Sequence, residues 1–231
     1  MQDAHASRVY WHKQAAQFIA FYQHKPILWS PLSFVRQFLS DRTKKLIAYA
    51  PSNPRTVMLD LGCGSGEQMK YFIPKCRYVY GLDYSRQMIQ EAKKELHLFP
   101  KKKYRLILAD AHHIPLKNHT INIVIAMGLL DYVNSPKIVI KECSRILKPN
   151  GILVASIPKQ PSLFSLLRTP FGNTLRKYIF HLPPIQNTIT KKNLHQLFIS
   201  HGFTVQTITS VWGAMWMVKA KLASQGDALR S

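Results

Sequence analysis

Acidic residues are scarce in this sequence, and its last third has almost none. The 231 residues include 32 Lys and Arg but only 11 Asp and Glu, which gives a net charge of +21. Between Glu142 and Asp227 there is no acidic residue at all. A field of one sign attracts nucleic acid, anionic lipid headgroups or an acidic partner, and it also fits an ordinary solvated surface. The charge therefore bears on what the protein associates with, but it does not identify the partner.

Cysteine and long apolar segments are also rare. The three cysteines, Cys63, Cys76 and Cys143, lie far apart and form no Cys-x-x-Cys pair, which argues against a disulfide framework and a zinc site. The longest uncharged apolar stretch, residues 205–218, is shorter than the ~20 residues of a spanning helix. No secretory signal is visible at the N-terminus. We expect a cytoplasmic protein without a bound metal, and peripheral contact with an anionic membrane or nucleic acid stays open, as does the oligomeric state.

Apolar residues are plentiful, at 46% of the chain, and predict one globular domain over residues 1–231. The first 54 residues read as a helical cap. Apolar residues at helical spacing predict one helix from about Arg8 to Gln23, and Ser30-Pro31 is typical of the start of a second helix that continues to about Ala50.

From Arg55 onward, short apolar runs alternate with amphipathic stretches, a pattern that predicts an α/β fold with a doubly wound, mostly parallel seven-stranded sheet. The expected strands are Thr56–Leu61, Tyr78–Leu82, Arg105–Ala109, Ile121–Met127, Ile152–Ile157, Phe203–Val211 and Ala214–Leu222, the last two forming an antiparallel hairpin. The expected helices between them are Glu67–Phe72, Arg86–Leu96, Pro136–Leu147 and Lys191–Ser200. This pattern divides the chain into a core (55–158), a proline-rich insertion (159–190) and a terminal helix with its hairpin (191–222).

The sharpest local signal is a glycine-rich loop after the first expected strand, Asp60-x-Gly62-x-Gly64-x-Gly66. Glycine permits positive φ in a turn and lets a ligand approach the backbone closely. Dinucleotide-binding proteins space their glycines as Gly-x-Gly-x-x-Gly, and phosphate loops need Gly-Lys-Ser or Gly-Lys-Thr. The loop fits neither form, although it does suit a nucleotide-like ligand at a strand–helix junction.

In these motifs the sequence resembles class I S-adenosylmethionine-dependent methyltransferases, closely over residues 55–158 and more loosely over 191–222. The resemblance implies the Rossmann-like fold of that family and S-adenosylmethionine as cofactor. It also implies cofactor-binding roles for four groups of residues. The acid and loop that hold the amino-acid part are Asp60, Gly62, Cys63, Gly64 and Gly66; Asp83 and Tyr84 lie at the ribose, Asp110 and Ala111 at the adenine, and Met127 and Gly128 beside the methionine.

The methyl acceptor is less well defined. Small-molecule and lipid-modifying members resemble this chain most, which implies an acceptor of that kind. Asp131 and Tyr132 follow the fourth expected strand, where such proteins often place acceptor-facing groups, although a helix-start polar group and a packing aromatic explain them equally well. We expect His112 and His113 to be surface loop residues.

Two alternatives remain. The charge favours an RNA methyltransferase, yet Met127-Gly128-Leu129-Leu130 is not the Asn-Pro-Pro-Tyr-like tetrad that presents a flipped base. A non-catalytic cofactor-binding protein would be favoured by damaged motifs, and the motifs here are intact.

Overall fold

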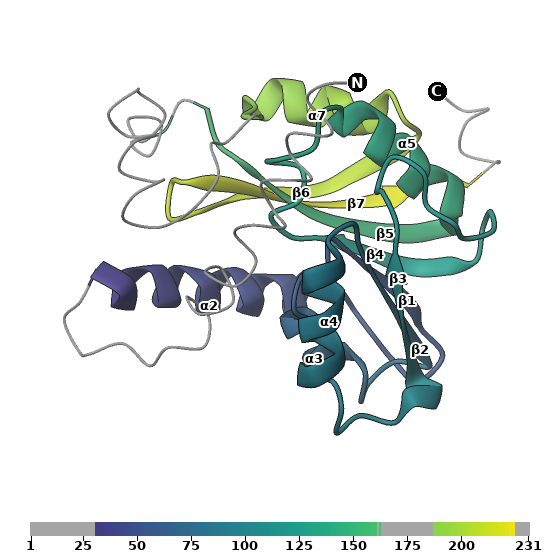
Figure 1. Ribbon diagram of the computed structural model, residues 1–231. Helices are drawn as coiled ribbons and strands as arrows, with labels where there is room; N and C mark the ends of the chain where they lie inside the picture. Colours follow the sequence, from purple (N-terminus) through teal and green to yellow (C-terminus); the bar gives the residue numbers. More distant parts are fainter. Residues whose placement is uncertain (1–30, 161, 163–186, 225–231) are drawn as a thin grey trace.

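The computed structural model describes residues 31–160, 162 and 187–224, which form one seven-stranded sheet in the order β3-β2-β1-β4-β5-β7-β6 (Figure 1). The strands are β1 (Val57–Leu61), β2 (Tyr78–Asp83), β3 (Tyr104–Leu108), β4 (Ile121–Ala126), β5 (Leu147–Pro158), β6 (Phe203–Val211) and β7 (Met215–Leu222). Strands β1 to β5 pair in parallel, whereas β7 pairs antiparallel with both β5 and β6. This is the predicted doubly wound sheet with its terminal hairpin.

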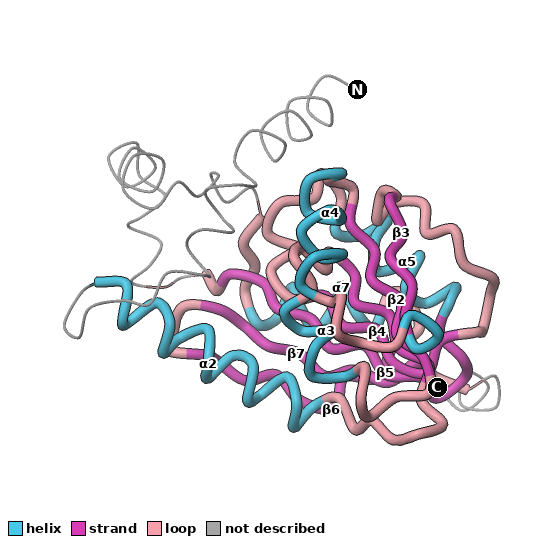
Figure 2. The backbone as a smooth tube through the Cα atoms, turned by 60° about the horizontal axis from the view of Figure 1, so that its bottom comes forward, coloured by secondary structure: helices cyan, strands magenta, loops and turns pink. Residues whose placement is uncertain are grey.

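Helices cover both faces of the sheet. The helices are α2 (Pro31–Tyr49), α3 (Glu67–Phe72), α4 (Arg86–Glu95), α5 (Pro136–Ile146) and α7 (Lys191–Ile199), and a 3-10 turn, η1 (Lys101–Lys103), precedes β3. Helices α2, α3 and α4 lie on one side of the sheet, and α5 and α7 lie on the other (Figures 1 and 2). The central strands β1 and β4 bury both of their faces, so their apolar runs are nearly continuous.

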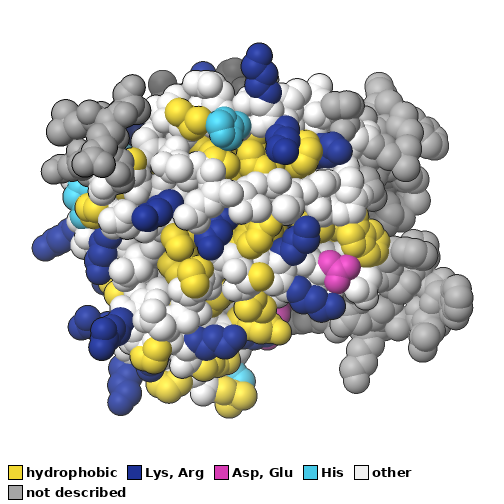
Figure 3. Space-filling view, turned by 180° about the vertical axis from the view of Figure 1, so that it is seen from behind, with side chains coloured by type: hydrophobic (Ala, Val, Ile, Leu, Met, Phe, Trp, Pro, Cys, Tyr) yellow, Lys and Arg dark blue, Asp and Glu magenta, His cyan; other side chains and the backbone are white. Residues whose placement is uncertain are grey.

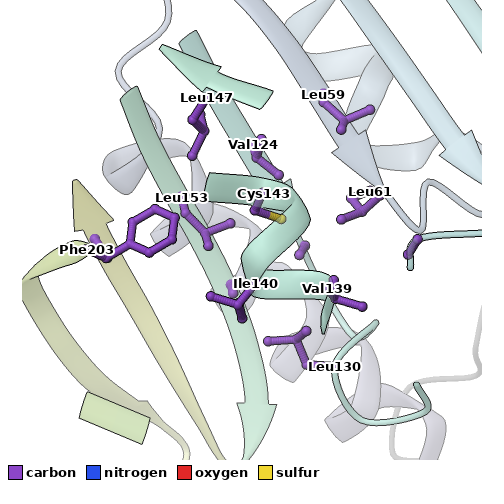
Figure 4. Close-up of a cluster of buried hydrophobic side chains, with 14 of the residues drawn as sticks. Leu59, Leu61, Val124, Leu130, Val139, Ile140, Cys143, Leu147, Leu153 and Phe203 are labelled. Carbon is purple, nitrogen blue, oxygen red and sulfur yellow. The ribbon is translucent and has the colours of Figure 1, made fainter. Parts of the chain in front are cut away.

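Two buried clusters correspond to these two faces. One cluster joins the sheet to α5 and α7 through Ile140 and Phe198, and Figure 4 shows part of it around Cys143. The other joins the sheet to α2, α3 and α4 through Leu46, Phe72 and Ile89. All three cysteines are buried free thiols.

Local capping explains where the helices start. The side chains of Ser85 and Ser135 accept hydrogen bonds from the backbone N–H groups of Met88 and Ile138, as the predicted N-caps require. Thr190 does the same at α7, a cap that the sequence analysis missed. Helices α4, α5 and α7 each end one residue before the predicted boundary.

The segment before the predicted fifth strand differs from expectation. We predicted a turn over residues 148–151 and a strand that begins at Ile152, but β5 already begins at Leu147. Its pairing with β4 shifts register between Ile121 and Ile123, and Asn150 has φ 65. Residues 148–151 therefore leave the regular ladder, because these four residues of β5 lie opposite the single residue Asn122 of β4. Gly151 is required there because a Cβ atom would lie 2.8 Å from the carbonyl oxygen of Lys148.

The terminal hairpin holds α2 against the sheet. Trp212 and Gly213 have φ 52 and 66, and the N–H of Ala214 donates to the carbonyl of Val211, which closes the predicted turn. The Trp212 indole N–H donates to Asp41 Oδ2 of α2 at 3.1 Å. Further along α2, the Tyr49 hydroxyl lies 3.1 Å from Thr209 Oγ1.

Several expectations concern residues outside the described ranges. They are the helix from Arg8 to Gln23, the Ser30 cap and most of the insertion at 159–190. The division of the chain into a cap, core, insertion and terminal segment stays a prediction. In the described residues, no helix combines the length and the hydrophobicity needed to cross a membrane.

Candidate functional site

The glycine loop connects the carboxyl end of β1 to α3. Gly62, Gly64 and Gly66 all have positive φ, at 77, 52 and 85, a conformation that L side chains rarely adopt. The N–H groups of Gly62 and Cys63 both donate to the carbonyl of Leu82 in β2, at 2.7 and 3.0 Å. The loop is thus fixed to the neighbouring strand, and Cys63 packs inside it.

The glycines of the loop differ in what surrounds them. A Cβ atom at Gly62 would lie 3.0 Å from the Leu129 side chain, and one at Gly66 would lie 3.2 Å from that of Leu96. A Cβ at Gly64 would meet nothing within 4 Å. Gly62 and Gly66 therefore allow close packing, whereas Gly64 presents backbone to open space where a ligand can approach.

Asp60 is a buried carboxylate directly before this loop. It is 2% exposed, and its Oδ2 atom has no hydrogen-bond partner in the described structure. Burial raises its pKa to about 7, helped by the negative charge of Asp83 and opposed by the positive charge of Arg42. A buried carboxylate without a partner is costly, so this atom suits a cationic group of a ligand.

Asp83, at the end of β2, is held differently. Its Oδ2 accepts a hydrogen bond from the Gly64 N–H at 3.0 Å, and its Oδ1 accepts one from the Ser85 N–H at 2.8 Å. Burial raises the pKa of Asp83, while the backbone N–H groups of Ser85, Gly64 and Tyr84 lower it. The carboxylate is therefore fixed in orientation, and it retains acceptor capacity for hydroxyl groups.

The loop after β3 lies beside Asp83, because the Ala109 N–H donates to the Asp83 carbonyl. Asp110 Oδ1 lies 2.6 Å from His112 Nδ1, and the Ser135 N–H donates to His112 Nε2 at 3.4 Å. The expectation that His112 is a surface residue is wrong, because it is partly buried and connects Asp110 to the cap of α5. His113 is exposed as expected, and Ala111 is buried in the α5 and α7 cluster.

Residues 114–118 continue this loop and are held by Arg145 of α5. Its guanidinium donates to the carbonyls of Ile114 and Leu116, at 2.8 and 2.9 Å, and to the side chain of Asn118. Glu142 accepts from Arg145 and from the Ile114 N–H. The Arg145 hydrogen bond lowers the pKa of Glu142 most strongly. This network positions the Asp110 loop.

The end of β4 completes the carboxyl edge of the sheet. Met127 is buried, and the Gly128 N–H donates to the Ser156 hydroxyl of β5. Asp131 is buried and Tyr132 is partly buried in the loop that follows. Asn187 holds this loop, because its side chain donates to the carbonyls of Leu130 and Val133.

The structure brings the predicted residues of β1, β2 and β4 to one edge, since Asp60 pairs with Gly81 and Ile125 in the neighbouring strands. It also adds residues that sequence reasoning missed. Arg42 of α2 lies near Gly128, and Asn187 holds the loop after β4. No motif marks either residue, because each is brought in by tertiary packing. Within the described ranges, no three His, Cys, Asp or Glu residues gather as metal ligands.

This architecture defines the class of protein. The strand order, the antiparallel seventh strand and the glycine loop at the switch point between β1 and β4 are those of the Rossmann-like methyltransferase fold. A solved structure from Aquifex aeolicus, a SAM-dependent methyltransferase, shares this fold with a TM-score of 0.66 at 18% identity. The match covers 90% of this chain and 98% of that one.

The sequence comparisons name the family. Residues 59–155 match the family described as methyltransferase domain, in agreement with the resemblance to class I S-adenosylmethionine-dependent methyltransferases. A malonyl-[acyl-carrier protein] O-methyltransferase of Marinomonas sp. is 29% identical over 59% of this chain and 50% of its own length. A demethylmenaquinone methyltransferase of Lactococcus lactis is 29% identical over 63% of this chain and 65% of its own. The chain thus spans about half the length of the first curated relatives that it matches.

The residues present fit the cofactor of this class. The unpartnered Oδ2 of buried Asp60 suits the ammonium group of its methionine part. Asp83 retains acceptor capacity for the ribose hydroxyls, and Gly64 leaves the space that a close approach needs. Individual cofactor contacts of these residues stay predictions.

Proposed function

We propose that this protein transfers the methyl group of S-adenosylmethionine to a small-molecule or lipid-like acceptor. One observation carries the proposal: the buried carboxylates Asp60 and Asp83 lie at the carboxyl ends of the neighbouring strands β1 and β2, with Asp60 one residue before the last, beside a glycine loop that is open at Gly64. One carboxylate suits a cation and the other suits hydroxyl groups, and both groups belong to this cofactor. The methyltransferase domain match over residues 59–155 supports the same reaction.

When bound, S-adenosylmethionine would supply an electrophilic methyl group on its sulfonium. The protein then has to place the acceptor in line with that methyl group, and proximity and orientation supply much of the rate. Asp83 needs no reorganisation to bind, because its carboxylate is already held by backbone N–H groups. Met127 and Gly128 border the place proposed for the methionine part.

Asp131 and Tyr132 are the proposed acceptor-facing residues. If the acceptor is a hydroxyl, the Asp131 carboxylate would take its proton, although methyl transfer does not always need a base. Asn187 fixes this loop, because its N–H donates to the Asp131 carbonyl at 3.1 Å. Relatives named for malonyl-[acyl-carrier protein] and demethylmenaquinone support an acceptor of this general kind.

The net charge of +21 favours RNA as a second candidate acceptor. On the face drawn in Figure 3, Lys and Arg side chains are spread out and do not gather in one patch. On that face, a spread charge gives general attraction to polyanions without a defined track for a strand. The small-molecule acceptor therefore stays first, and contact with an anionic membrane through this surface remains a proposal.

Calorimetry with S-adenosylmethionine tests the proposal. The wild-type protein should bind, and Asp83→Ala should weaken binding about 10- to 100-fold, because hydrogen bonds to a charged acceptor are lost. Glu91→Ala is the matched control, since Glu91 is an acid of α4 that pairs with Lys94 on the surface. Thermal melting shows whether each variant is folded.

A screen for methyl transfer then identifies the acceptor among lipid, quinone, phenol and RNA fractions. Transfer to a lipid, quinone or phenol supports the first candidate, and transfer to RNA alone supports the second. Absence of cofactor binding by the folded wild type would contradict the central proposal.

A further inference from the structure

Arg42 is a buried cation without a partner in the described structure. The residue belongs to α2 and is 9% exposed, and its Nε atom has no hydrogen-bond partner. No hydrogen bond or ion pair joins Arg42 to any other described residue. A guanidinium has five N–H donors, and a buried donor that is left without an acceptor is costly. Such a group suits an anion that the chain itself does not supply.

The guanidinium lies at the carboxyl edge of the sheet. A Cβ atom added to Gly128 would lie 3.3 Å from Arg42 Nη1, so the charge is beside the end of β4. Gly128 has φ 73 and is fixed by its hydrogen bond to Ser156. The residue from α2 therefore reaches the edge where β1 and β4 end.

Asp60 lies at the same edge and carries the opposite charge. Arg42 is close enough to lower the pKa of Asp60, yet no contact within 4.0 Å joins the two side chains among the described ion pairs. Asp60 Oδ2 and Arg42 Nε are both buried and unpartnered. Two buried opposite charges that do not meet suit a ligand that carries both charges on neighbouring atoms, as an α-amino acid does.

We propose that Arg42 binds the α-carboxylate of the methionine part of S-adenosylmethionine, while Asp60 binds its α-ammonium group. This inference rests on the proposed function and adds a residue that lies before the methyltransferase domain match at 59–155. It makes α2 part of the cofactor site.

The contacts of α2 keep Arg42 in place. Asp41 accepts from the Trp212 indole, Lys45 donates to the Ser210 carbonyl, and Tyr49 bonds Thr209. These bonds join the helix to the β6–β7 hairpin on either side of Arg42. The guanidinium is therefore positioned before the ligand arrives, which lowers the entropy cost of binding.

The test compares two ligands on the full chain by calorimetry. S-Adenosylhomocysteine carries the α-amino acid group, and 5′-methylthioadenosine lacks it. Arg42→Met should lower the affinity for S-adenosylhomocysteine roughly 30-fold or more, as expected when one partner of a buried charge pair is lost. Its affinity for 5′-methylthioadenosine should not change. Lys44→Met is the matched control, because Lys44 is an exposed cation of the same helix, and it should leave both affinities unchanged.

A second variant and a melting curve separate binding from folding. Arg42→Lys keeps the charge but loses the planar fork, and it should recover part of the affinity for S-adenosylhomocysteine. The ligand-free Arg42→Met protein should melt no lower than the wild type, because an unpartnered buried charge has been replaced by an apolar side chain.

Each outcome decides the inference. If Arg42→Met lowers the affinity for both ligands equally, or leaves the affinity for S-adenosylhomocysteine unchanged, the role of Arg42 is overturned and the proposed function stays intact. If Arg42→Met does not fold, the same comparison is made with Arg42→Lys, where equal effects on both ligands overturn the inference. A wild type that binds neither ligand contradicts the proposed function itself.

Discussion

Asp60 shows how a single binding residue costs stability. In the unfolded chain its pKa is near 3.8, and in the folded protein burial raises it to about 7. Below both values the side chain is protonated in both states. As the pH rises from about 4 to 7, the unfolded state ionises first, and the folded state loses relative stability. The shift corresponds to an upper bound of about 4 kcal/mol.

Asp60→Asn should remove this pH dependence. The unfolding free energy of the wild type, minus that of the variant, should fall as the pH is raised from 4 to 8. Urea unfolding at several pH values measures this difference. A difference that does not change with pH would show that Asp60 is not buried as an isolated acid. The variant should also bind S-adenosylhomocysteine more weakly at pH 8, because the negative charge is gone.

Substitution of Gly64 separates the effect of backbone strain on stability from the effect of an added side chain on cofactor binding. Gly64 has φ 52 and Gly213 has φ 66, and a Cβ at either position would meet nothing within 4 Å. Alanine should therefore cost each position about 1–2 kcal/mol of stability through backbone strain alone. Only Gly64→Ala should also weaken cofactor binding, because its Cβ would enter the space proposed for the ligand. Thermal melting and calorimetry of both variants test this, and equal binding by both would place the ligand elsewhere.

At the scale of elements, α5 determines the position of the loop after β3. Arg145→Met should lower the unfolding free energy by about 1–2 kcal/mol, because the carbonyls of Ile114 and Leu116 lose a partly buried charged donor. Lys141→Met, at an exposed position on the same helix, should have little effect. Urea unfolding measures both variants, and equal values would mean that the network does not stabilise the loop.

The acid partner in this network titrates in the opposite direction to Asp60. The pKa of Glu142 is lowered, so its stabilising contribution is present above the usual value of 4.5 and is lost as the pH falls through the lowered value. The loss caused by Arg145→Met should therefore shrink in strongly acidic solution.

At the scale of the whole molecule, the two faces of the sheet position different parts of the site. The cluster under α2, α3 and α4 holds the helix that carries Arg42, and the cluster under α5 and α7 holds the loops after β3 and β4. The site lies at the carboxyl edge between them, at the point where the strand order reverses from β1 to β4.

The sequence by itself determined the elements and the main chemistry of the site. Periodicity and turn residues are local, so they predicted six of the seven strands to within one residue and the start of α3, α4, α5 and α7, whereas β5 begins five residues before the predicted start. The alternation of strands and helices also predicted the doubly wound, mostly parallel sheet, whereas the order of its strands was seen only in the structure.

Tertiary structure alone decided what depends on distant contacts. The irregular pairing at residues 148–151 depends on β4, and the partial burial of His112 depends on contacts with Asp110 and Ser135. Arg42 belongs to a helix with no motif, and it becomes a candidate ligand group only because α2 packs against the hairpin and buries its charge. A residue's local neighbours determine its conformation, whereas the electrostatic role of a buried charge depends on which groups the whole fold brings near it.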